Sequence, residues 1–341
     1  MKSKILITGS EGFIGKKLVK KLDKKYNLFL IDKKKSKTKR NKNYQIDLQD
    51  INQLDLFLKD NKINTIIHLA SEIFDDDKNV YSHNVNTSKN IIKMAEKYKI
   101  NNLIFTSTFS IYEKNYNKPI KENEPPSAKN FYGKSKYQIE QILKKSKIKY
   151  FTILRIPVVV GKSRSHRMGI LFELIRNNLP LILINNGKHK IHFISVDELS
   201  IIIEKCLKLK KRYLLNVGSE HTFTFKENLE FILKKTNSKS KIININYYIG
   251  SFLLNFLILF KLVDINLYHK ALLTQNMVLN TNKSNRLLNL NLNKSSREIL
   301  LESYKYYVNN LNQINSIKTG SDKKPRLKIF NILRFFSFLF K

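Results

Sequence analysis

The stretch "ILITGSEGFIG", near the start of the chain, places three glycines between a short apolar run and an amphipathic one. Gly9, Gly12 and Gly15 are three of only ten glycines in 341 residues. Glycine here permits a tight turn, close approach of the backbone to a pyrophosphate, and close packing of the following helix. The free N–H groups at the start of that helix favour an anion. An ordinary glycine turn is the alternative, but the context predicts a strand, a dinucleotide phosphate cradle and a helix.

Apolar β-rich runs alternate with helical ones through the first half of the chain. The expected strands are 4–8, 28–32, 44–47, 64–70, 102–108 and 150–156, and helices are expected from Phe13, over 86–98 and from near Tyr132. Continuous apolar strands separated by helices indicate a parallel sheet covered on both faces. The sequence therefore predicts the α/β class, with a Rossmann-like doubly wound parallel sheet and a smaller α/β substrate-binding domain.

Asp32 ends the second expected strand, about twenty residues after the glycine loop. A carboxylate at this position can accept hydrogen bonds from both ribose hydroxyls of NAD, and it would repel the 2′-phosphate of NADP. The following run "KKKSKTKR" could hold that phosphate, although such a run is more often a solvated surface. NAD is therefore the favoured cofactor and NADP the alternative.

The pattern becomes irregular beyond Pro157, which suggests a second unit. We expect residues 1–156 to form the NAD-binding domain, with returning segments near 191–218. Residues 157–318 should form mainly the substrate-binding domain, and 319–341 a linker and an amphipathic tail.

The composition excludes several classes of protein. The net charge of +36 comes from lysines spread along the whole chain, without a basic stripe or a zinc motif, so specific nucleic-acid binding is not expected. A single cysteine, Cys206, rules out an internal disulfide and fits a reducing cytoplasm. No metal site is expected, and the longest apolar runs are too short to cross a bilayer as helices.

The stretch "NFYGKSKYQIE" places Lys136 four residues after Tyr132. Chance alone would give a basic residue at that distance after roughly three of the sixteen tyrosines, yet only this tyrosine has one. The two side chains would lie one turn apart on a helix, where the ammonium group can lower the cost of forming a phenolate. An exposed tyrosine and lysine on a helix would be the structural alternative.

These motifs, in this order, resemble the extended short-chain dehydrogenases/reductases, and specifically the NAD-dependent epimerase/dehydratase family. The resemblance covers roughly residues 3–310 and includes "TGSEGFIG", "IDL", "IIHLAS", "NVNTSKNIIKMA", "FTSTFSIY", "YGKSK", "FISVDEL" and "LNVGS". It implies a catalytic set of Tyr132, Lys136 and Thr108, with Ser107 and Ser110 as neighbours that could share the role of the hydroxyl group.

The loop and the resemblance together define candidate binding residues. The cofactor set is Gly9, Gly12, Phe13, Ile14, Gly15, Asp32, Asp47, Leu48, Leu69, Ala70, Lys136 and Pro157. The candidate substrate-binding residues are Ser110, Arg164, Arg167 and Lys190, with Lys188 as a further basic candidate. His68 and Asn86 also match motif positions and are interpreted as structural, as is Asp197, which is expected to cap a helix.

The sequence also departs from the family pattern. Phe109 and Ser110 follow Thr108 where sugar dehydratases usually carry an acidic pair, so 4,6-dehydration is disfavoured. Ile191 stands where an arginine often holds the substrate diphosphate. The resemblance therefore implies an NAD-dependent nucleotide-sugar 4-epimerase, with UDP-hexose or UDP-N-acetylhexosamine as substrate. A nucleotide-sugar 4-ketoreductase of surface-polysaccharide synthesis and a non-catalytic NAD-binding scaffold or sensor are the alternatives.

The closing stretch "KIFNILRFFSFLFK" spaces its polar residues three or four apart and leaves a broad Phe, Leu and Ile face. Such a helix would suit a membrane interface, or it could dock on the body or on a second subunit. The expected partners are a nucleotide sugar, a second copy in a homodimer, and a membrane contacted through this tail. The expected location is the cytoplasm, at the inner face of the membrane if the tail binds there.

Overall fold

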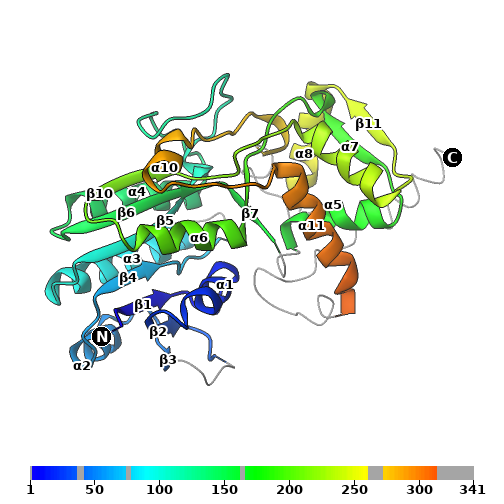
Figure 1. Ribbon diagram of the computed structural model, residues 1–341. Helices are drawn as coiled ribbons and strands as arrows, with labels where there is room; N and C mark the ends of the chain where they lie inside the picture. The colour runs from blue at the N-terminus through cyan, green and yellow to red at the C-terminus, as the bar shows by residue number, and fades with distance from the viewer. Residues whose placement is uncertain (1, 37–41, 74–77, 162–165, 260–271, 313–341) are drawn as a thin grey trace.

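The computed structural model describes residues 2–36, 42–73, 78–161, 166–259 and 272–312 (Figure 1). Its main sheet has seven parallel strands in the order β10-β6-β5-β4-β1-β2-β3. These strands are β1 (Lys4–Thr8), β2 (Asn27–Asp32), β3 (Lys42–Gln45), β4 (Thr65–His68), β5 (Asn102–Thr108), β6 (Tyr150–Ile156) and β10 (Arg212–Asn216). The chain begins in the middle of the sheet and extends it first to one edge and then to the other, which is the doubly wound order. The predicted fold class is confirmed.

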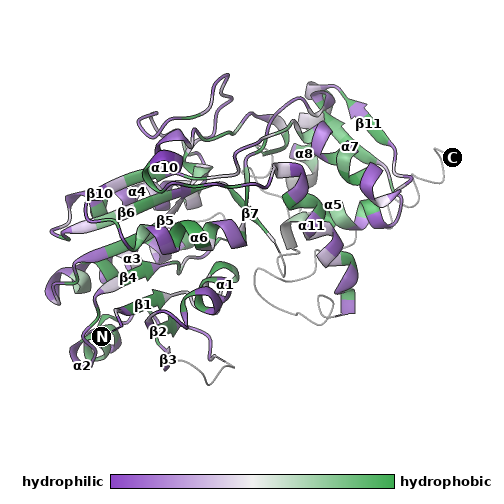
Figure 2. Ribbon diagram, in the orientation of Figure 1, coloured by the Kyte–Doolittle hydropathy of each residue, from purple (hydrophilic) through white to green (hydrophobic). Residues whose placement is uncertain are grey.

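Helices cover both faces of this sheet because alternate strand residues point to opposite sides. Leu6 and Phe29 pack on one face, where they meet side chains of α2 (Ile51–Asp60), α3 (Lys78–Lys97) and α4 (Phe131–Lys145). Ile5 and Ile7 pack on the other face against α1 (Phe13–Leu22) and α6 (Val196–Cys206). Figure 2 shows hydrophobic residues along the strands and along one side of the helices.

The second part of the chain builds two small parallel sheets. β7 (Val158–Val160) pairs with β9 (Phe193–Ser195), and β8 (Leu181–Ile184) pairs with β11 (Ile242–Ile245). The remaining described helices are α5 (His166–Arg176), α7 (Phe225–Thr236), α8 (Tyr247–Leu259), α10 (Asn282–Leu287) and α11 (Ser296–Asn309), and two single 3₁₀ turns are η1 (Phe109–Ile111) and η2 (Asn185–Gly187). A separate apolar core joins β8, α5, α7 and α11 (Figure 1). The predicted division into domains at residue 156 stays a prediction.

Two helices differ from the sequence expectation. α2 is not among the expected elements, and α3 begins at Lys78, eight residues before the stretch in which the sequence predicts it. The early turns of α3 are held in place because Val80, Asn84 and Val85 are buried there, and Asn84 forms hydrogen bonds with the backbone of Glu72. Within the described residues, no helix combines the length and apolar character needed to cross a membrane.

Candidate active site

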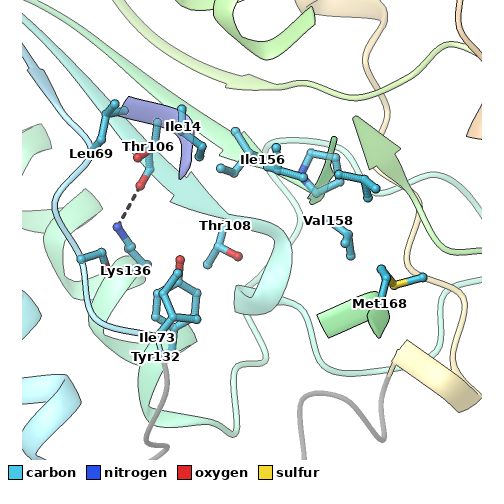
Figure 3. Close-up of a pocket in the computed structure, with 14 residues that line it drawn as sticks. Ile14, Leu69, Ile73, Thr106, Thr108, Tyr132, Lys136, Ile156, Val158 and Met168 are labelled. Carbon is cyan, nitrogen blue, oxygen red and sulfur yellow. Dashed lines mark hydrogen bonds between the residues drawn. The ribbon is translucent and has the colours of Figure 1, made fainter. Parts of the chain in front are cut away.

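A pocket of about 100 Å³ lies where β4, β5 and β6 end. The carboxyl ends of strands in a doubly wound sheet are where ligands bind, because the chain turns to opposite faces there. The pocket is lined by Ile14, Leu69, Ser71, Ile73, Thr106, Thr108, Tyr132, Lys136, Ile156, Pro157, Val158, Val159, Val160 and Met168 (Figure 3). Lys136 and five other residues predicted for the cofactor site or for catalysis therefore face the same pocket. These five are Ile14, Leu69, Thr108, Tyr132 and Pro157.

The glycine loop joins β1 to α1 beside this pocket. Gly9 has φ +70°, and a Cβ there would lie 2.7 Å from the Ala70 nitrogen. A Cβ on Gly15 would lie 2.2 Å from the Gly9 carbonyl oxygen, so α1 can begin this close to the strand only with glycine. A Cβ on Gly12 would meet only the Gly9 oxygen, at 3.1 Å. The three glycines thus keep a compact loop, with Gly12 on its open side.

Asp32 lies at the end of β2, next to the glycine loop. Its carboxylate accepts hydrogen bonds from the Glu11 N–H at 2.9 Å and from the Lys34 N–H at 2.9 Å. Lys33, the first residue of the lysine run, forms an ion pair with Glu72 in the loop after β4. The carboxylate is therefore held at the loop by backbone groups, and the nearest lysine is paired with an acid.

The remaining cofactor candidates surround this loop. Asp47 follows β3 and accepts a hydrogen bond from the Gln49 N–H at 2.9 Å, and Leu48 is buried. Phe13 packs with the α1 side of the main core, and the Ala70 N–H donates to the Thr8 hydroxyl at 3.4 Å. These residues lie at the ends of neighbouring strands, as the sequence indicated.

Lys136 is buried in α4, and its ammonium group points into the pocket (Figure 3). Nζ donates to the Thr106 carbonyl oxygen at 3.0 Å and lies 4.8 Å from the centre of the Phe105 ring and 5.8 Å from that of Tyr132. Burial lowers the pKa of Lys136 to about 7, against an opposing effect of Glu140. The lysine can therefore change its protonation state near neutral pH.

Tyr132 is placed by the first turn of α4, which packs tightly on η1. Asn130 caps this helix by accepting a hydrogen bond from the Gly133 N–H at 2.6 Å. A Cβ on Gly133 would lie 2.3 Å from the Ser110 carbonyl oxygen, so this glycine lets the helix start next to η1. Figure 3 shows the Tyr132 hydroxyl directed towards the space between Lys136 and Thr108.

The three candidate hydroxyl residues at the end of β5 and just after it lie in different places. Thr108 lines the pocket, and its Oγ1 accepts from the Ser110 N–H at 3.1 Å and lies 3.0 Å from the Ser110 Oγ. Ser110 is buried behind Thr108 and is not among the lining residues. Ser107 points to the opposite side of the strand, where it donates to Glu140 at 2.6 Å. Ser107 therefore does not share the pocket with Thr108.

A buried ion pair supports α4 from behind the site. The Arg155 guanidinium donates to both carboxylate oxygens of Glu140, at 3.0 and 2.7 Å, and both side chains are buried. Arg155 also donates to Tyr112 and to the Glu122 carbonyl oxygen. Sequence reasoning missed this network, although Glu140 follows Lys136 at the next helical turn.

Of the two motif residues interpreted as structural, His68 has that role, whereas Asn86 was misassigned. His68 is buried, with Nδ1 at 2.7 Å from the Thr8 hydroxyl and Nε2 at 2.9 Å from the Ser88 hydroxyl, and burial lowers its pKa to about 3. Asn86 is exposed and lies inside α3, so placing it at a helix start was wrong. The structural asparagine is Asn84, which exchanges hydrogen bonds with the backbone of Glu72 at 2.8 and 2.9 Å.

Of the residues expected on the substrate side, the described ones, Ser110 and Lys190, do not line the pocket. Lys190 is exposed and absent from the lining, while Ile191 belongs to the second core. Lys188 is exposed as well. Arg164 and the Arg167 side chain lie outside the described residues. The residues after Pro157 that do line the pocket are Val158, Val159, Val160 and Met168, none of which is charged.

The cap of α6 also differs from the expectation. Ser195 is the N-cap, and it forms a capping box with Glu198. Asp197 sits in the first turn and forms an ion pair with Lys17 of α1. The expectation that Asp197 caps this helix was wrong, because the serine one position before the helix already satisfies its free N–H groups.

Sequence reasoning also missed pocket residues. The Thr106 carbonyl oxygen accepts a hydrogen bond from Lys136. Ser71, the last residue of the motif "IIHLAS", and Ile73, two residues later, also line the pocket. Ser71 and Thr106 lie within motifs that had been recognised, so a closer look at their neighbours could have found them. Met168 comes from α5, in the irregular second part, and carried no such signal.

Comparison with known proteins gives related sequences and structures. The model of the family described as "NAD dependent epimerase/dehydratase family" matches residues 5–218. The chain is 32% identical over 184 residues to N-acetyl-alpha-D-glucosaminyl-diphospho-ditrans,octacis-undecaprenol 4-epimerase of Escherichia coli O157:H7, covering 52% of this chain and 54% of that protein. It is 26% identical to UDP-glucose 4-epimerase of Lactobacillus helveticus, over 72% of this chain and 84% of that one.

The fold is shared more widely than the sequence. The crystal structure of UDP-glucose 4-epimerase from Thermotoga maritima, with UDP-glucose, superposes with a TM-score of 0.75 at 19% identity. The superposition covers 90% of this chain and 99% of that one. At this level of identity the likeness concerns the fold.

Proposed function

The chain belongs to the NAD dependent epimerase/dehydratase family, and we propose that it is a nucleotide-sugar 4-epimerase acting on a UDP-hexose or UDP-N-acetylhexosamine. One observation carries the proposal. Tyr132, Lys136 and Thr108 face a single pocket beside the glycine loop, and Phe109 and Ser110 occupy the positions where a dehydratase would need acids. The related 4-epimerases support the same reaction.

NAD is the cofactor of the family, and the residues of the loop suit it. Gly12 leaves the open side of the loop free of a side chain, where a pyrophosphate could approach the backbone. Asp32 would accept the ribose hydroxyls, and its charge, with Lys33 already paired to Glu72, disfavours a 2′-phosphate. NAD bound here supplies a reversible hydride acceptor for the C4 position of the sugar.

The catalytic roles follow from the positions of the side chains. Tyr132 would take the proton of the C4 hydroxyl group and return it after the 4-keto sugar has turned over in the pocket. Tyrosine has a reference pKa near 10, so a base at neutral pH needs about 4 kcal/mol of phenolate stabilisation. The Lys136 ammonium would supply part of it, and Thr108 would hold the reacting oxygen by a hydrogen bond.

The uncharged walls of the pocket suit the turning of an intermediate. Val158, Val159 and Met168 offer apolar contact without fixed ionic contacts to one hydroxyl pattern. A 4-keto sugar that must present both faces needs such weak lateral contacts, while its diphosphate is held elsewhere. The Escherichia coli relative is named for a sugar carried on undecaprenol diphosphate, so a lipid-linked sugar is a second candidate substrate.

A panel assay tests the proposal. The purified protein is incubated with UDP-, GDP- and dTDP-sugars, and with a polyprenyl-diphosphate-linked N-acetylhexosamine, followed by chromatography for a new epimer. We expect one substrate to give its C4 epimer without net consumption of NADH. Stoichiometric use of NAD(P)H on a 4-keto sugar, with no nicotinamide retained on purification, would instead identify a 4-ketoreductase. No conversion of any sugar, with tight NAD binding, would favour a scaffold or sensor.

Two partner assignments remain proposals. A homodimer is common for this fold family, and the tail at 319–341 would touch the membrane from the cytoplasmic side. The tail lies outside the described residues. Light scattering would measure the mass in solution, and deletion of residues 325–341 should reduce liposome binding if the tail contributes.

A further inference from the structure

Glu113, five residues after Thr108, is buried although it is acidic. Its side chain accepts hydrogen bonds from the Lys129 backbone N–H, from the Asn130 backbone N–H at 2.9 Å and from the Asn130 side-chain amide at 2.6 Å. Asn130 is the N-cap of α4, so the carboxylate lies at the start of this helix, where the helix dipole favours a negative charge. Three N–H donors therefore compensate the burial of Glu113.

The Glu113–Asn130 pair joins the two segments that carry the candidate hydroxyl groups. Glu113 follows the turn that begins at Thr108, and Asn130 lies two residues before Tyr132. The Asn130 amide also donates to the Ser110 carbonyl oxygen at 3.5 Å, and the Ser110 Oγ lies 3.0 Å from the Thr108 Oγ1. The pair thus ties the turn after β5 to the first turn of α4, from which the Tyr132 hydroxyl reaches the pocket (Figure 3).

Tyr132 depends on this tie more than Lys136 does. The first N–H groups of a helix have no partner within it, so the position of the first turn is set by its cap. Here Asn130 accepts from the Gly133 N–H at 2.6 Å, and Tyr132 lies between these two residues. Lys136, one turn later, is held separately by its hydrogen bond to the Thr106 carbonyl oxygen. A change at the pair should therefore displace Tyr132 and leave Lys136 in place.

The hydrogen bonds of the pair have a fixed direction. Asn130 donates through Nδ2 to Glu113 and accepts through Oδ1 from Gly133, so turning the amide over would lose both bonds. Glu113 must accept on both of its oxygens, which a carboxylate can do and a carboxamide cannot. We propose that Glu113 is a positioning residue for the Tyr132 hydroxyl group and acts through Asn130. Its effect on the rate rests on the proposed function, whereas the placement of Tyr132 can be measured without a sugar.

The loop between the two residues has a second closure. The Ser127 N–H donates to the Ile111 carbonyl oxygen at 2.7 Å, and the Ser127 hydroxyl accepts from the Glu113 backbone N–H at 2.9 Å. Neither bond uses the Glu113 side chain. A substitution that changes only the carboxylate should therefore leave the loop closed and the chain folded.

Glu113→Gln tests the role of the carboxylate, because the amide that it introduces must face an N–H donor in either orientation. We expect kcat to fall roughly 10- to 100-fold, because a small displacement of a catalytic group lowers the rate. KM and the content of bound NAD should stay within twofold of wild type. Glu124→Gln makes the same chemical change in the same loop, where Glu124 forms an ion pair with Lys114 at 3.5 Å, and should retain kcat within twofold.

A double variant restores the direction of the hydrogen bonds. In Glu113→Gln/Asn130→Asp, the new amide can donate to the new carboxylate, which still accepts from the Gly133 N–H, and the net charge is unchanged. The weak contact to Ser110 is not restored, so we expect kcat to return to within about fivefold of wild type. Asn130→Asp alone places two carboxylates side by side and should be as slow as Glu113→Gln.

Fluorine NMR measures the placement of Tyr132 without any sugar. The full chain is prepared with 3-fluorotyrosine at position 132 and compared in the wild type, Glu113→Gln and the double variant. We expect the resonance to shift or split in Glu113→Gln and to return to the wild-type position in the double variant. If the wild type converts no sugar, the proposed function fails, and this measurement alone decides the role of Glu113.

Four results would overturn the proposal. The first is a Glu113→Gln variant with kcat within twofold of wild type or with an unchanged fluorine resonance. The second is a double variant as slow as Glu113→Gln, and the third is an equal loss in Glu124→Gln. If Glu113→Gln does not fold, Asn130→Ser decides, because serine caps a helix but lacks the amide that binds Glu113. An Asn130→Ser variant with kcat and resonance like those of wild type is the fourth.

Discussion

The carboxyl edge of the main sheet and the small sheets after β6 position their side chains in different ways. At the sheet edge, Asp32 and Thr108 each end a strand, and the glycine loop follows one; the neighbours of each of these strands fix its register on both sides. In the second part, β7–β9 and β8–β11 are isolated pairs of three or four residues. The difference teaches that the proposed cofactor and proton-transfer groups are positioned by the sheet, while the proposed contacts to the sugar depend on local loops and helices.

The largest expected effect comes from removing the hydroxyl group of Tyr132. Tyr132→Phe should lower kcat by roughly 10²–10⁴-fold, because the variant keeps the ring but has no group to transfer the C4 proton. Tyr137→Phe, five residues along the same helix and partly buried, is the control and should retain activity within twofold. Comparable losses in both variants would point to a general effect on α4 and would contradict the assigned role.

Gly15→Ala should have the next largest effect, on the region that the sheet positions. The added Cβ would lie 2.2 Å from the Gly9 carbonyl oxygen, a backbone atom that cannot move aside without shifting the loop. We expect the free energy of unfolding to fall by about 3 kcal/mol and NAD to be lost on purification. Gly12→Ala, with its nearest atom at 3.1 Å, should remain folded and lose mainly NAD affinity. Urea unfolding and bound-nicotinamide content measure both, and equal stability of the two variants would refute the distinction.

The pH dependence of the free energy of unfolding allows a direct comparison of the two regions. Burial lowers the pKa of His68, in the main sheet, to about 3 and that of His192, beside β9, to about 4. The unfolded pKa is near 6.5, so the stabilisation from each neutral histidine is present above pH 6.5 and is lost as the pH falls from 6.5 towards the folded value. For each histidine, this loss should lower the free energy of unfolding by about 2 kcal/mol between pH 7.5 and 5.0.

The hydrogen bonds of His192 explain why the folded state disfavours a second proton on its ring. Its Nδ1 accepts from the Leu279 N–H at 3.1 Å, and its Nε2 lies 2.8 Å from the Ser219 carbonyl oxygen, to which it donates. A second proton, on Nδ1, would remove the acceptor of the hydrogen bond from the Leu279 N–H. Urea unfolding of His68→Asn and His192→Asn at both pH values should show a decline shallower by about 2 kcal/mol in each variant if the two regions unfold together. A decline that flattens in only one variant would show that the regions unfold separately.

The smallest expected effect is at Lys190. This side chain is exposed and does not line the pocket, so Lys190→Ala should change KM for the active sugar less than twofold. Steady-state kinetics measures it. A tenfold rise in KM would show that the second part brings this lysine to the diphosphate, and it would reinstate the expectation from the sequence.

The sequence predicted the first region well for physical reasons. Apolar strands of five to seven residues such as β1, β5 and β6 were located to the residue, because buried parallel strands are continuous apolar runs. The glycine loop and the Tyr132 helix were found because their spacing reflects a requirement of the backbone or of the chemistry. Asn86 and Asp197 were misassigned because a neighbour, Asn84 or Ser195, could equally satisfy the same motif, and only packing distinguishes them.

The second region could not be predicted in the same way. Its strands have three or four residues, and the pocket residue Met168 is an ordinary apolar side chain that looks like part of a core. Basic residues such as Lys190 were proposed from charge alone, and charge does not show whether a side chain points toward the pocket. Thr106 acts through its backbone carbonyl oxygen, so its side chain carried no signal.

The central claim is that the hydride removed from C4 returns to C4 of the same sugar, with Tyr132 moving the proton. The direct measurement supplies the active nucleotide sugar with deuterium at C4 and analyses the epimer by mass spectrometry and NMR. We expect that the product keeps the deuterium at C4, that no NADH accumulates, and that Tyr132→Phe forms no labelled epimer. Loss of the label to solvent, or product formation only with added NADH, would contradict it.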